Sequence, residues 1–265
     1  MTSPEPSGSE QPQWRPPPEV VERAKALAAG TLTAAEARHA STVVLLRDTP
    51  AGLEVQLQRR VASMAFAAGA HVFPGGRVDP ADATVVVDVP AAWVRVLGGG
   101  PDLARALVVC AVRETFEEAG VLLTDDPLPA DLPTARTADF AGLGVRPALR
   151  LLAPWGRWVT PEVEPRRYDT RFFVAAMPAG QVAAGDDAGG EADEALWIRP
   201  ADALARHRDG EMVLMPPTVF TLSELAEYAE TAAVLAAAAD RDCRPVLPRL
   251  LVEGDTVRFL THDEG

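Results

Sequence analysis

The chain has 265 residues, 48% of them apolar, and a formal net charge of −13. This length and apolar content are those of one large domain, or one domain with additions, that buries a core. The acidic balance argues against general binding to nucleic acid, which requires a basic surface. An anionic small molecule could bind at a local basic patch, so we expect a small-molecule partner and no nucleic acid.

The cysteine content and the start of the chain favour a cytoplasmic protein that does not contact membranes. Cys110 and Cys243 form neither a metal-type pair nor a disulfide framework, which fits a reducing compartment. There is no apolar run of about 18 residues, so we expect no membrane span. Residues 1–18 contain six prolines and lack the pattern of a secretory signal, so we expect a disordered tail.

The first predicted elements are a short helix and a hairpin. Residues 19–29 are expected to be helical, and residues 42–47 and 53–59 to form two strands. Between the strands, residues 48–52 read Asp-Thr-Pro-Ala-Gly, which is turn chemistry.

A glycine turn and a long helix follow. Val72-Phe73 ends a strand before Pro74-Gly75-Gly76. Asp102 is expected to cap a helix that ends near Ala119, with Gly120 as its stop. One stripe of apolar residues at helical spacing predicts the core face of this helix: Val109, Val112, Phe116 and Ala119. A second stripe of residues along this helix begins apolar and ends acidic: Leu107, Ala111, Glu114 and Glu118. This change predicts that the final turns of the helix open into a cleft.

The second half of the chain adds strands, helices and a closing hairpin. The expected elements are strands at 171–175 and 195–198, helices at 201–206 and 218–238, and a hairpin of residues 249–252 and 256–260. Strands and helices alternate but include hairpins. We therefore predict an α/β fold in which a mixed β-sheet lies between helices, as a single domain over residues 19–265.

Three glutamates dominate the chemistry of the long helix. Glu114, Glu117 and Glu118 are three and four positions apart and therefore share one helix face. Like charges on neighbouring turns repel, and a hard divalent cation such as Mg²⁺ would offset them. The alternative is a solvated acidic surface, which is the usual meaning of clustered glutamates.

The surrounding residues resemble the Nudix box, the signature of the Nudix hydrolase superfamily. Gly76 matches its first glycine, and the run 113–121, Arg-Glu-Thr-Phe-Glu-Glu-Ala-Gly-Val, matches its end. Asp82 stands where the family has Glu, and Thr115 where it usually has an apolar residue. Arg113 follows Asp82 by 31 positions rather than the family's eight, so an insertion of 23 residues, at about 83–105, interrupts the box. The insertion could lengthen the helix, lie over the cleft as a lid, or be a surface excursion.

An interrupted box resembles the subgroup of coenzyme A and acyl-coenzyme A diphosphatases. Residues 69–76, 153–155 and 166–170 resemble this subgroup too. A motif of many coenzyme A-directed Nudix enzymes is matched by Arg60, together with Gly69 and Phe73, but not by Val61 and Ala65. The resemblance implies a Nudix fold with a C-terminal helix and hairpin.

The resemblance also implies a metal site. Mg²⁺ or Mn²⁺ would be held by Glu114, Glu117, Glu118 and the backbone of Gly75. Arg113 and Gly76 would not bind the metal themselves but would hold the metal-binding residues in the correct orientation. The general base would come from the box, as Glu114 or Glu117, or from a later loop, as Glu191 with Glu194 as its neighbour; exposed loop acids are the alternative for the latter pair.

The implied substrate is a diphosphate linked to a nucleoside. Coenzyme A or an acyl derivative would give 3′,5′-ADP and a 4′-phosphopantetheine product; ADP-ribose or a dinucleotide is the alternative. Arg60, Arg166 and Arg167 are candidate phosphate ligands, although surface ion pairs would explain each one alone. A non-catalytic nucleotide-binding Nudix module is the rival from another class, and the sequence is also compatible with a homodimer.

Overall fold

The computed structural model describes residues 18–60, 69–128, 140–183, 192–253 and 256–260. The chain divides into two compact units. The larger one, which we call the sheet unit, comprises Ala37–Val159 and Tyr168–Val246. The smaller one, which we call the terminal unit, comprises the described parts of Met1–Glu36, Thr160–Arg167 and Leu247–Gly265. The predicted tail lies almost entirely outside the described residues.

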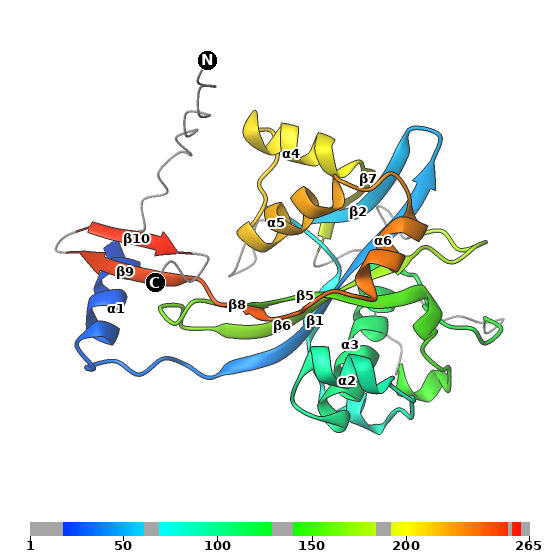
Figure 1. The fold of residues 1–265 in the computed structure, drawn as a ribbon, viewed down its shortest axis with the longest axis horizontal. Helices are drawn as coiled ribbons and strands as arrows, with labels where there is room; N and C mark the ends of the chain where they lie inside the picture. The colour runs from blue at the N-terminus through cyan, green and yellow to red at the C-terminus, as the bar shows by residue number, and fades with distance from the viewer. Residues whose placement is uncertain (1–17, 61–68, 129–139, 184–191, 254–255, 261–265) are drawn as a thin grey trace, which may run out of the picture. The chain divides into compact units, whose positions relative to one another are not determined.

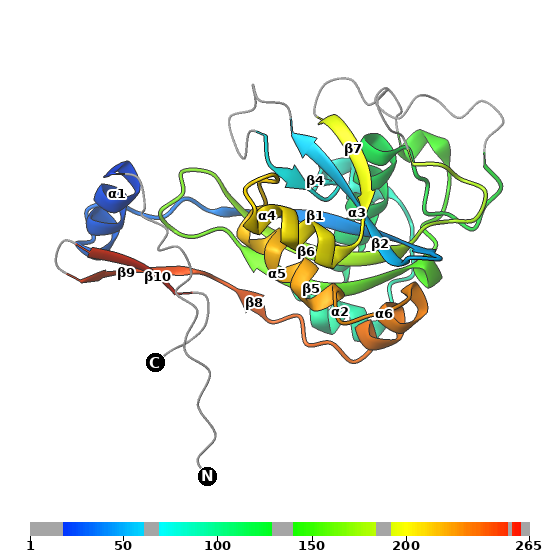
Figure 2. The same cartoon turned by 90° about the horizontal axis from the view of Figure 1, so that it is seen from above.

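A mixed β-sheet forms the centre of the sheet unit. Its strands are β1 (Ala37–Thr49), β2 (Gly52–Arg60), β3 (His71–Val72), β4 (Gly75–Arg77), β5 (Leu152–Val159), β6 (Arg167–Ala176), β7 (Ala192–Ile198) and β8 (Pro245–Val246). The order is β3-β2-β1-β6-β5-β8, with β4 also paired to β1 and β7 to β2. The pair β5 and β8 is parallel, whereas β1–β2, β2–β7 (side by side in Figure 2) and β5–β6 are antiparallel, so the prediction of a mixed sheet is confirmed.

The predicted hairpin is present at β1 and β2. Thr49 pairs with Gly52, whose φ of 113° is easily reached only without a side chain. Successive β1 residues pack into different core clusters, since Val43 and Leu45 join one and Val44 and Leu46 the other. This alternation with period two shows that both faces of the sheet are covered.

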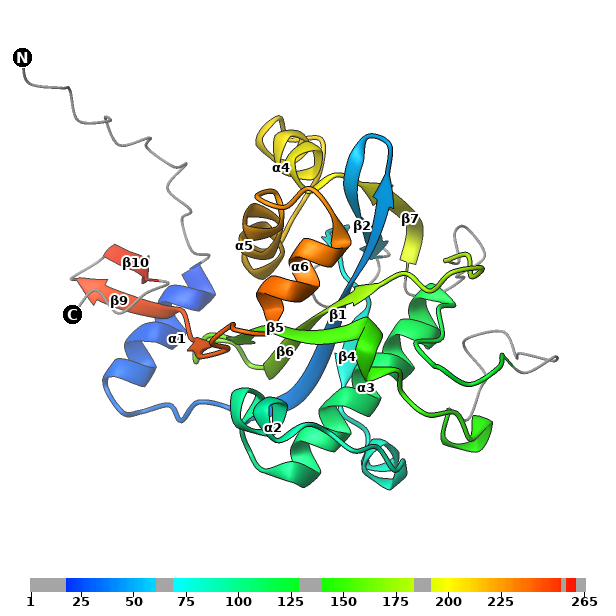
Figure 3. The same cartoon turned by 45° about the vertical axis from the view of Figure 1, so that its right-hand side comes forward.

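Helices cover the two faces (Figures 1 and 3). On one face lie α2 (Ala91–Leu97) and α3 (Pro101–Ala119). On the other lie α4 (Pro200–Arg208), α5 (Pro216–Leu225) and α6 (Thr231–Ala238). The predicted arrangement of helix, sheet and helix is thus confirmed.

The ends of α3 test the capping predictions. Its N-cap is Gly100 rather than Asp102, because Pro101 occupies the first helical position, where a missing N–H costs nothing. Asp102 instead lies in the first turn and pairs with Arg105 at 3.2 Å. Gly120 ends the helix as predicted, with a left-handed φ of 69° and its N–H donated to the Phe116 carbonyl.

The insertion in the box lengthens α3. The insertion, at about residues 83–105, supplies the first five residues of α3, Pro101–Arg105, which add about 7.5 Å of helix at 1.5 Å per residue. Leu97 and Ala104 in the insertion are fully buried. The rest of the insertion includes the end of the 3₁₀ turn η1 (Pro80–Thr84) and all of α2, and both of these elements contact α3. The insertion is therefore built into the core of the sheet unit.

The predicted helix over 218–238 is wrong. The structure has two helices, α5 and α6, separated by residues 226–230. Tyr228 in the gap packs edge-on against Trp155, with ring centroids 5.9 Å apart. The side chain of Asp48 accepts hydrogen bonds from the backbone N–H and the hydroxyl of Thr231, at 2.8 and 2.9 Å. These tertiary contacts end one helix and start the next.

The terminal unit combines α1 (Pro18–Ala28) with the antiparallel pair β9 (Arg249–Glu253) and β10 (Thr256–Leu260). The predicted first helix and closing hairpin are confirmed. Within this unit Arg23 Nε donates to the Val163 carbonyl at 2.6 Å. None of the helices in the described parts of the chain is long and apolar enough to span a bilayer.

Candidate active site

The long helix α3 lies against the glycine turn. Thr42 on β1 pairs with Gly75 on β4, and the Val43 N–H donates to the Pro74 carbonyl at 2.9 Å. Ser41 then donates its hydroxyl to the Leu107 carbonyl at 2.7 Å, which attaches α3 to the same strand. The two halves of the interrupted box are therefore adjacent in space.

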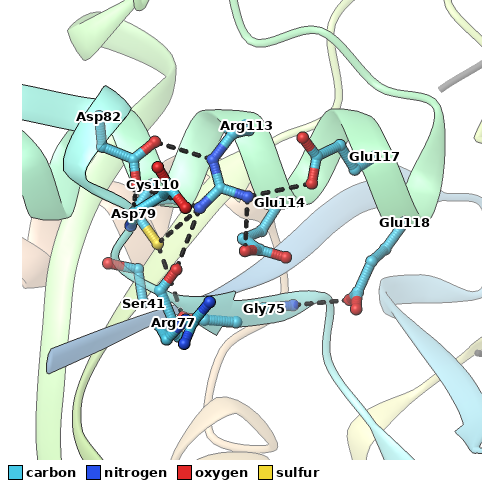
Figure 4. Close-up of polar contacts among 12 residues, drawn as sticks. Ser41, Gly75, Arg77, Asp79, Asp82, Cys110, Arg113, Glu114, Glu117 and Glu118 are labelled. Atoms are coloured by element: carbon cyan, nitrogen blue, oxygen red, sulfur yellow. Dashed lines mark hydrogen bonds and ion pairs between the residues drawn. The ribbon is translucent and has the colours of Figure 1, made fainter. Parts of the chain in front are cut away.

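Gly75 and Gly76 lie where no side chain fits. A Cβ on Gly76 would be 2.5 Å from Glu114 Oε1, and a Cβ on Gly75 would be 2.5 Å from the Ser41 carbonyl oxygen. The Gly75 N–H also donates to Glu118 Oε2 at 2.8 Å (Figure 4). Glycine at Gly76 thus allows the Glu114 carboxylate to approach the backbone, and glycine at Gly75 allows β4 to pack closely against β1.

Arg113 joins Asp82, which directly precedes the insertion, to the glutamates, as Figure 4 shows. Its Nε and Nη2 donate to the two oxygens of Asp82, at 2.7 and 3.0 Å. Its Nη1 donates to Glu114 Oε1 at 2.6 Å and to Glu117 Oε2 at 3.0 Å. One guanidinium therefore fixes the orientation of two glutamates, while buried Asp82 fixes the guanidinium.

The site carries an excess of negative charge. Asp82, Glu114 and Glu117 all pair with one guanidinium, that of Arg113, and Glu118 lies on the next turn of the same helix. Burial raises the pKa of the Glu114 carboxyl, and the charges of Glu117 and Asp82 add to this against the opposing effect of Arg113. Burial likewise raises the pKa of Glu117. Both shifts show that another positive charge would stabilise the ionised carboxylates.

The donor set fits a hard divalent cation. The carboxylates at the end of α3 carry more negative charge than Arg113 neutralises. Carboxylate oxygens are the ligands that Mg²⁺ prefers. Among the described residues, no three acidic, histidine or cysteine side chains converge on one point as a preformed metal cage. Arg113 and the Gly75 N–H instead hold one oxygen of each glutamate.

The carboxyl end of α3 is attached to β2. Gln58 is buried and donates its Nε2 to the Glu118 carbonyl at 3.1 Å. The sequence analysis did not identify this residue, although Gln56, Gln58 and Arg60 are polar residues at alternate positions of a buried strand, a pattern that indicates polar contacts. These alternate positions face α3, since the intervening Leu57 joins the core cluster on the opposite face of the sheet.

The remaining candidate residues are distributed over both units. Arg60 lies at the end of β2, with a buried Nε that has no hydrogen-bond partner among the described residues. Arg166 is an exposed residue of the terminal unit. Arg167 donates to the carbonyls of Thr160 and Ala35, at 3.0 and 2.7 Å. Glu191 lies outside the described residues, and the backbone of Glu194 belongs to β7. Their predicted functions stay predictions.

Comparison with solved structures decides the family. A crystal structure of a NUDIX hydrolase from Alicyclobacillus acidocaldarius is 33% identical, with a TM-score of 0.61, over 76% of this chain and 96% of that chain. The chain belongs to the Nudix hydrolase family. A comparison with models of protein families gives no match.

Curated relatives of this Nudix hydrolase include diphosphatases. The acyl-coenzyme A diphosphatase NUDT19 of Gallus gallus is 26% identical over 81% of this chain and 73% of its own length. The Homo sapiens protein of the same name is 29% identical over 69% of this chain, which spans 63% of that relative. The predicted resemblance to this subgroup is confirmed.

Proposed function

We propose that this Nudix hydrolase cleaves the diphosphate linkage of a nucleoside diphosphate derivative with the help of Mg²⁺ or Mn²⁺. The observation that carries the proposal is the placement of Glu114 and Glu118 against Gly76 and Gly75, with Arg113 holding the acidic cluster. A nucleotide-binding module without catalysis would have no use for this arrangement.

The metal would be held by Glu114, Glu117 and Glu118, together with the backbone of Gly75. When bound, such an ion offsets charge on phosphoryl oxygens and lowers the pKa of a bound water. Asp82 and Arg113 keep the glutamates in place before substrate arrives, so less ordering remains to be done in the transition state.

A carboxylate of this chain would accept the proton of the attacking water. The candidates are Glu114 and Glu117 in the box and Glu191 in the segment before β7. Of the two described candidates Glu114 is the more buried, with 13% of its side chain exposed against 30% for Glu117. Glu191→Gln separates the two sources, because it lowers kcat only if the base is outside the box.

The preferred substrate is coenzyme A or an acyl-coenzyme A, cleaved to 3′,5′-ADP and a 4′-phosphopantetheine product. Support comes from the relatives named acyl-coenzyme A diphosphatase. Arg60, Arg166 and Arg167 are the proposed phosphate ligands. ADP-ribose and dinucleotides are the competing substrates. The proposal includes a cytoplasmic location, which the two free cysteines fit, and a homodimer.

Glu118→Gln tests the proposal. The variant keeps the size of the side chain but removes a metal-binding charge, so we expect the fold to persist and turnover to fall at least about 10³-fold. Turnover is measured at saturating Mg²⁺ and Mn²⁺ against coenzyme A, acyl-coenzyme A, ADP-ribose and dinucleoside polyphosphates, with thermal unfolding as the check on folding.

The matched control is Glu227→Gln, which makes the same chemical change at an exposed position after α5. We expect wild-type turnover from the control. Near-wild-type turnover of Glu118→Gln would contradict the metal site. A wild-type protein inactive on the whole panel would favour the binding module.

A further inference from the structure

The carbonyl of Glu118 lies at the end of α3, where the hydrogen bonds of the helix stop. The last four carbonyls of a helix find no N–H group within it and need other partners. The helical partner of Glu118 would be the Leu122 N–H, four residues on, but this group donates to Gln181 Oε1 at 2.9 Å. Gln58 Nε2 donates to the Glu118 carbonyl at 3.1 Å. A side chain of the sheet therefore caps the helix at a residue of the acidic cluster.

Gln58 is a fixed donor, because the sheet holds it on both sides. It is buried, and its backbone pairs with Val72 of β3 and with Ala195 of β7. The preceding residue, Leu57, packs into the core cluster on the opposite face of the sheet. An amide also donates without bringing another charge into a buried site, where an ionised group would be costly.

The same strand pairing connects Gln58 to the glycine turn. Val72, which pairs with Gln58, lies three residues before Gly75. The Gly75 N–H donates to Glu118 Oε2 at 2.8 Å (Figure 4). Glu118 is therefore held at two points, its carboxylate by Gly75 and its carbonyl by Gln58. The β2–β3 pairing fixes the positions of these two points relative to each other.

We propose that Gln58 is a positioning residue for Glu118 and, through it, for the divalent cation. It fixes the height of the last turn of α3 above the sheet, so that the Glu118 carboxylate reaches Gly75. This inference rests on the proposed function, in which Glu118 is a metal ligand. A group that orients a metal ligand acts on metal affinity, and its loss typically costs about 10-fold to 100-fold in affinity or activity.

Gln58→Met tests the inference, since methionine has nearly the shape of glutamine and no amide to donate. We expect the dissociation constant of Mn²⁺ for the substrate-free protein, measured by calorimetry, to rise about tenfold or more. The Mg²⁺ concentration for half-maximal rate should rise with it, because both depend on the placement of Glu118. Thermal unfolding checks that the variant is folded. A Mn²⁺ affinity equal to that of wild type would overturn the inference.

Gln58→Asn carries the same test should Gln58→Met not fold. It keeps a buried amide but withdraws it from the Glu118 carbonyl by one methylene group. We expect a smaller rise in the Mn²⁺ dissociation constant in the same direction. An unchanged constant in this folded variant would overturn the inference.

Gln181→Met is the matched control for loss of an amide at this end of α3. It removes two hydrogen bonds to the Leu122 backbone, at 2.9 and 2.8 Å, and none to Glu118. We expect a lower melting temperature and an unchanged Mn²⁺ affinity. Equal losses of Mn²⁺ affinity in the two methionine variants would overturn the inference, because any loosening of this chain end would then suffice.

A double-mutant cycle with Glu118→Gln supplies the decisive readout. If Gln58 acts through the Glu118 carboxylate, Gln58→Met costs no further Mn²⁺ affinity in the Glu118→Gln background. A double variant whose affinity falls by the product of the two single losses would overturn the inference. Failure of the proposed function is a separate result. The wild-type protein would then bind Mn²⁺ but hydrolyse none of the diphosphates in the panel, while Gln58→Met still weakened Mn²⁺ binding.

Discussion

At the scale of single residues, the site depends on two glycines as much as on three glutamates. Gly76→Ala should reduce kcat at least about tenfold, because the new Cβ would be 2.5 Å from Glu114 Oε1 and would displace that carboxylate. The measurement is steady-state turnover together with the Mg²⁺ concentration for half-maximal rate, which we expect to rise.

Gly156→Ala is the matched control for Gly76→Ala. A Cβ on Gly156 meets nothing within 4 Å, so the substitution adds the same group in open space. We expect wild-type turnover from this variant. Equal losses of turnover in both variants would show that the effect at Gly76 does not come from the displaced glutamate.

The residues of the site differ in how far the sequence specifies them. Helical spacing alone places Glu114 and Glu118 on one face, so the acidic cluster was predictable. The pairing of Asp82 with Arg113 spans the 31 positions of the interrupted box, and only the Nudix resemblance pointed to Asp82. Gln58 belongs to no motif, because its partner is the Glu118 carbonyl, a backbone group whose position depends on the tertiary fold.

At the scale of elements, a buried charge cluster fastens the insertion to the sheet. Arg171 on β6 donates Nε and Nη2 to the Leu97 carbonyl at the end of α2, at 3.0 and 2.9 Å. Asp169 pairs with Arg171 at 2.8 Å and accepts two bonds from Arg157, both 2.8 Å. The carboxylate of Asp169 thus holds the guanidinium that holds α2.

Asp169→Asn should destabilise the protein in a pH-dependent way. Burial alone would raise the pKa of Asp169, but the bonds from Arg157 and the charge of Arg171 lower it overall. A lowered carboxyl pKa contributes stability that is fully present above the unfolded value, about 3.9, and is lost as the pH falls from there through the lower pKa of the folded state. We expect a loss of about 3 kcal/mol at pH 7 that shrinks below about pH 4.

The measurement is the free energy of unfolding of both proteins across this pH range. His39 also faces Asp169, with its Nδ1 3.6 Å from Oδ2. A stability difference that stays constant down to pH 3 would contradict the role of the Asp169 charge.

The elements that sequence reasoning missed are those shaped by contacts from far along the chain. The break between α5 and α6 depends on Asp48, which lies 183 positions before Thr231. The local sequence pattern of residues 218–238 indicates one unbroken amphipathic helix. The β1–β2 hairpin and the end of α3 were predictable, because Gly52 and Gly120 act on their immediate neighbours.

At the scale of the whole molecule, net charge opposes the proposed substrate. The chain carries a formal charge of −13, and a nucleoside diphosphate derivative is itself an anion. Long-range repulsion lowers the local concentration of such a ligand, while salt shortens its reach from about 30 Å at 0.01 M to about 8 Å at 0.15 M.

We therefore expect kcat/KM to rise about twofold or more as monovalent salt is added over this range at constant free Mg²⁺. The cause would be screening of the overall negative charge, so kcat at saturating substrate should change little. A kcat/KM that falls with salt would mean that attraction by a nearby cation such as Arg60 outweighs the net charge. Arg60→Gln distinguishes the two cases, because it should steepen the rise if global repulsion dominates and flatten the fall if attraction by Arg60 does.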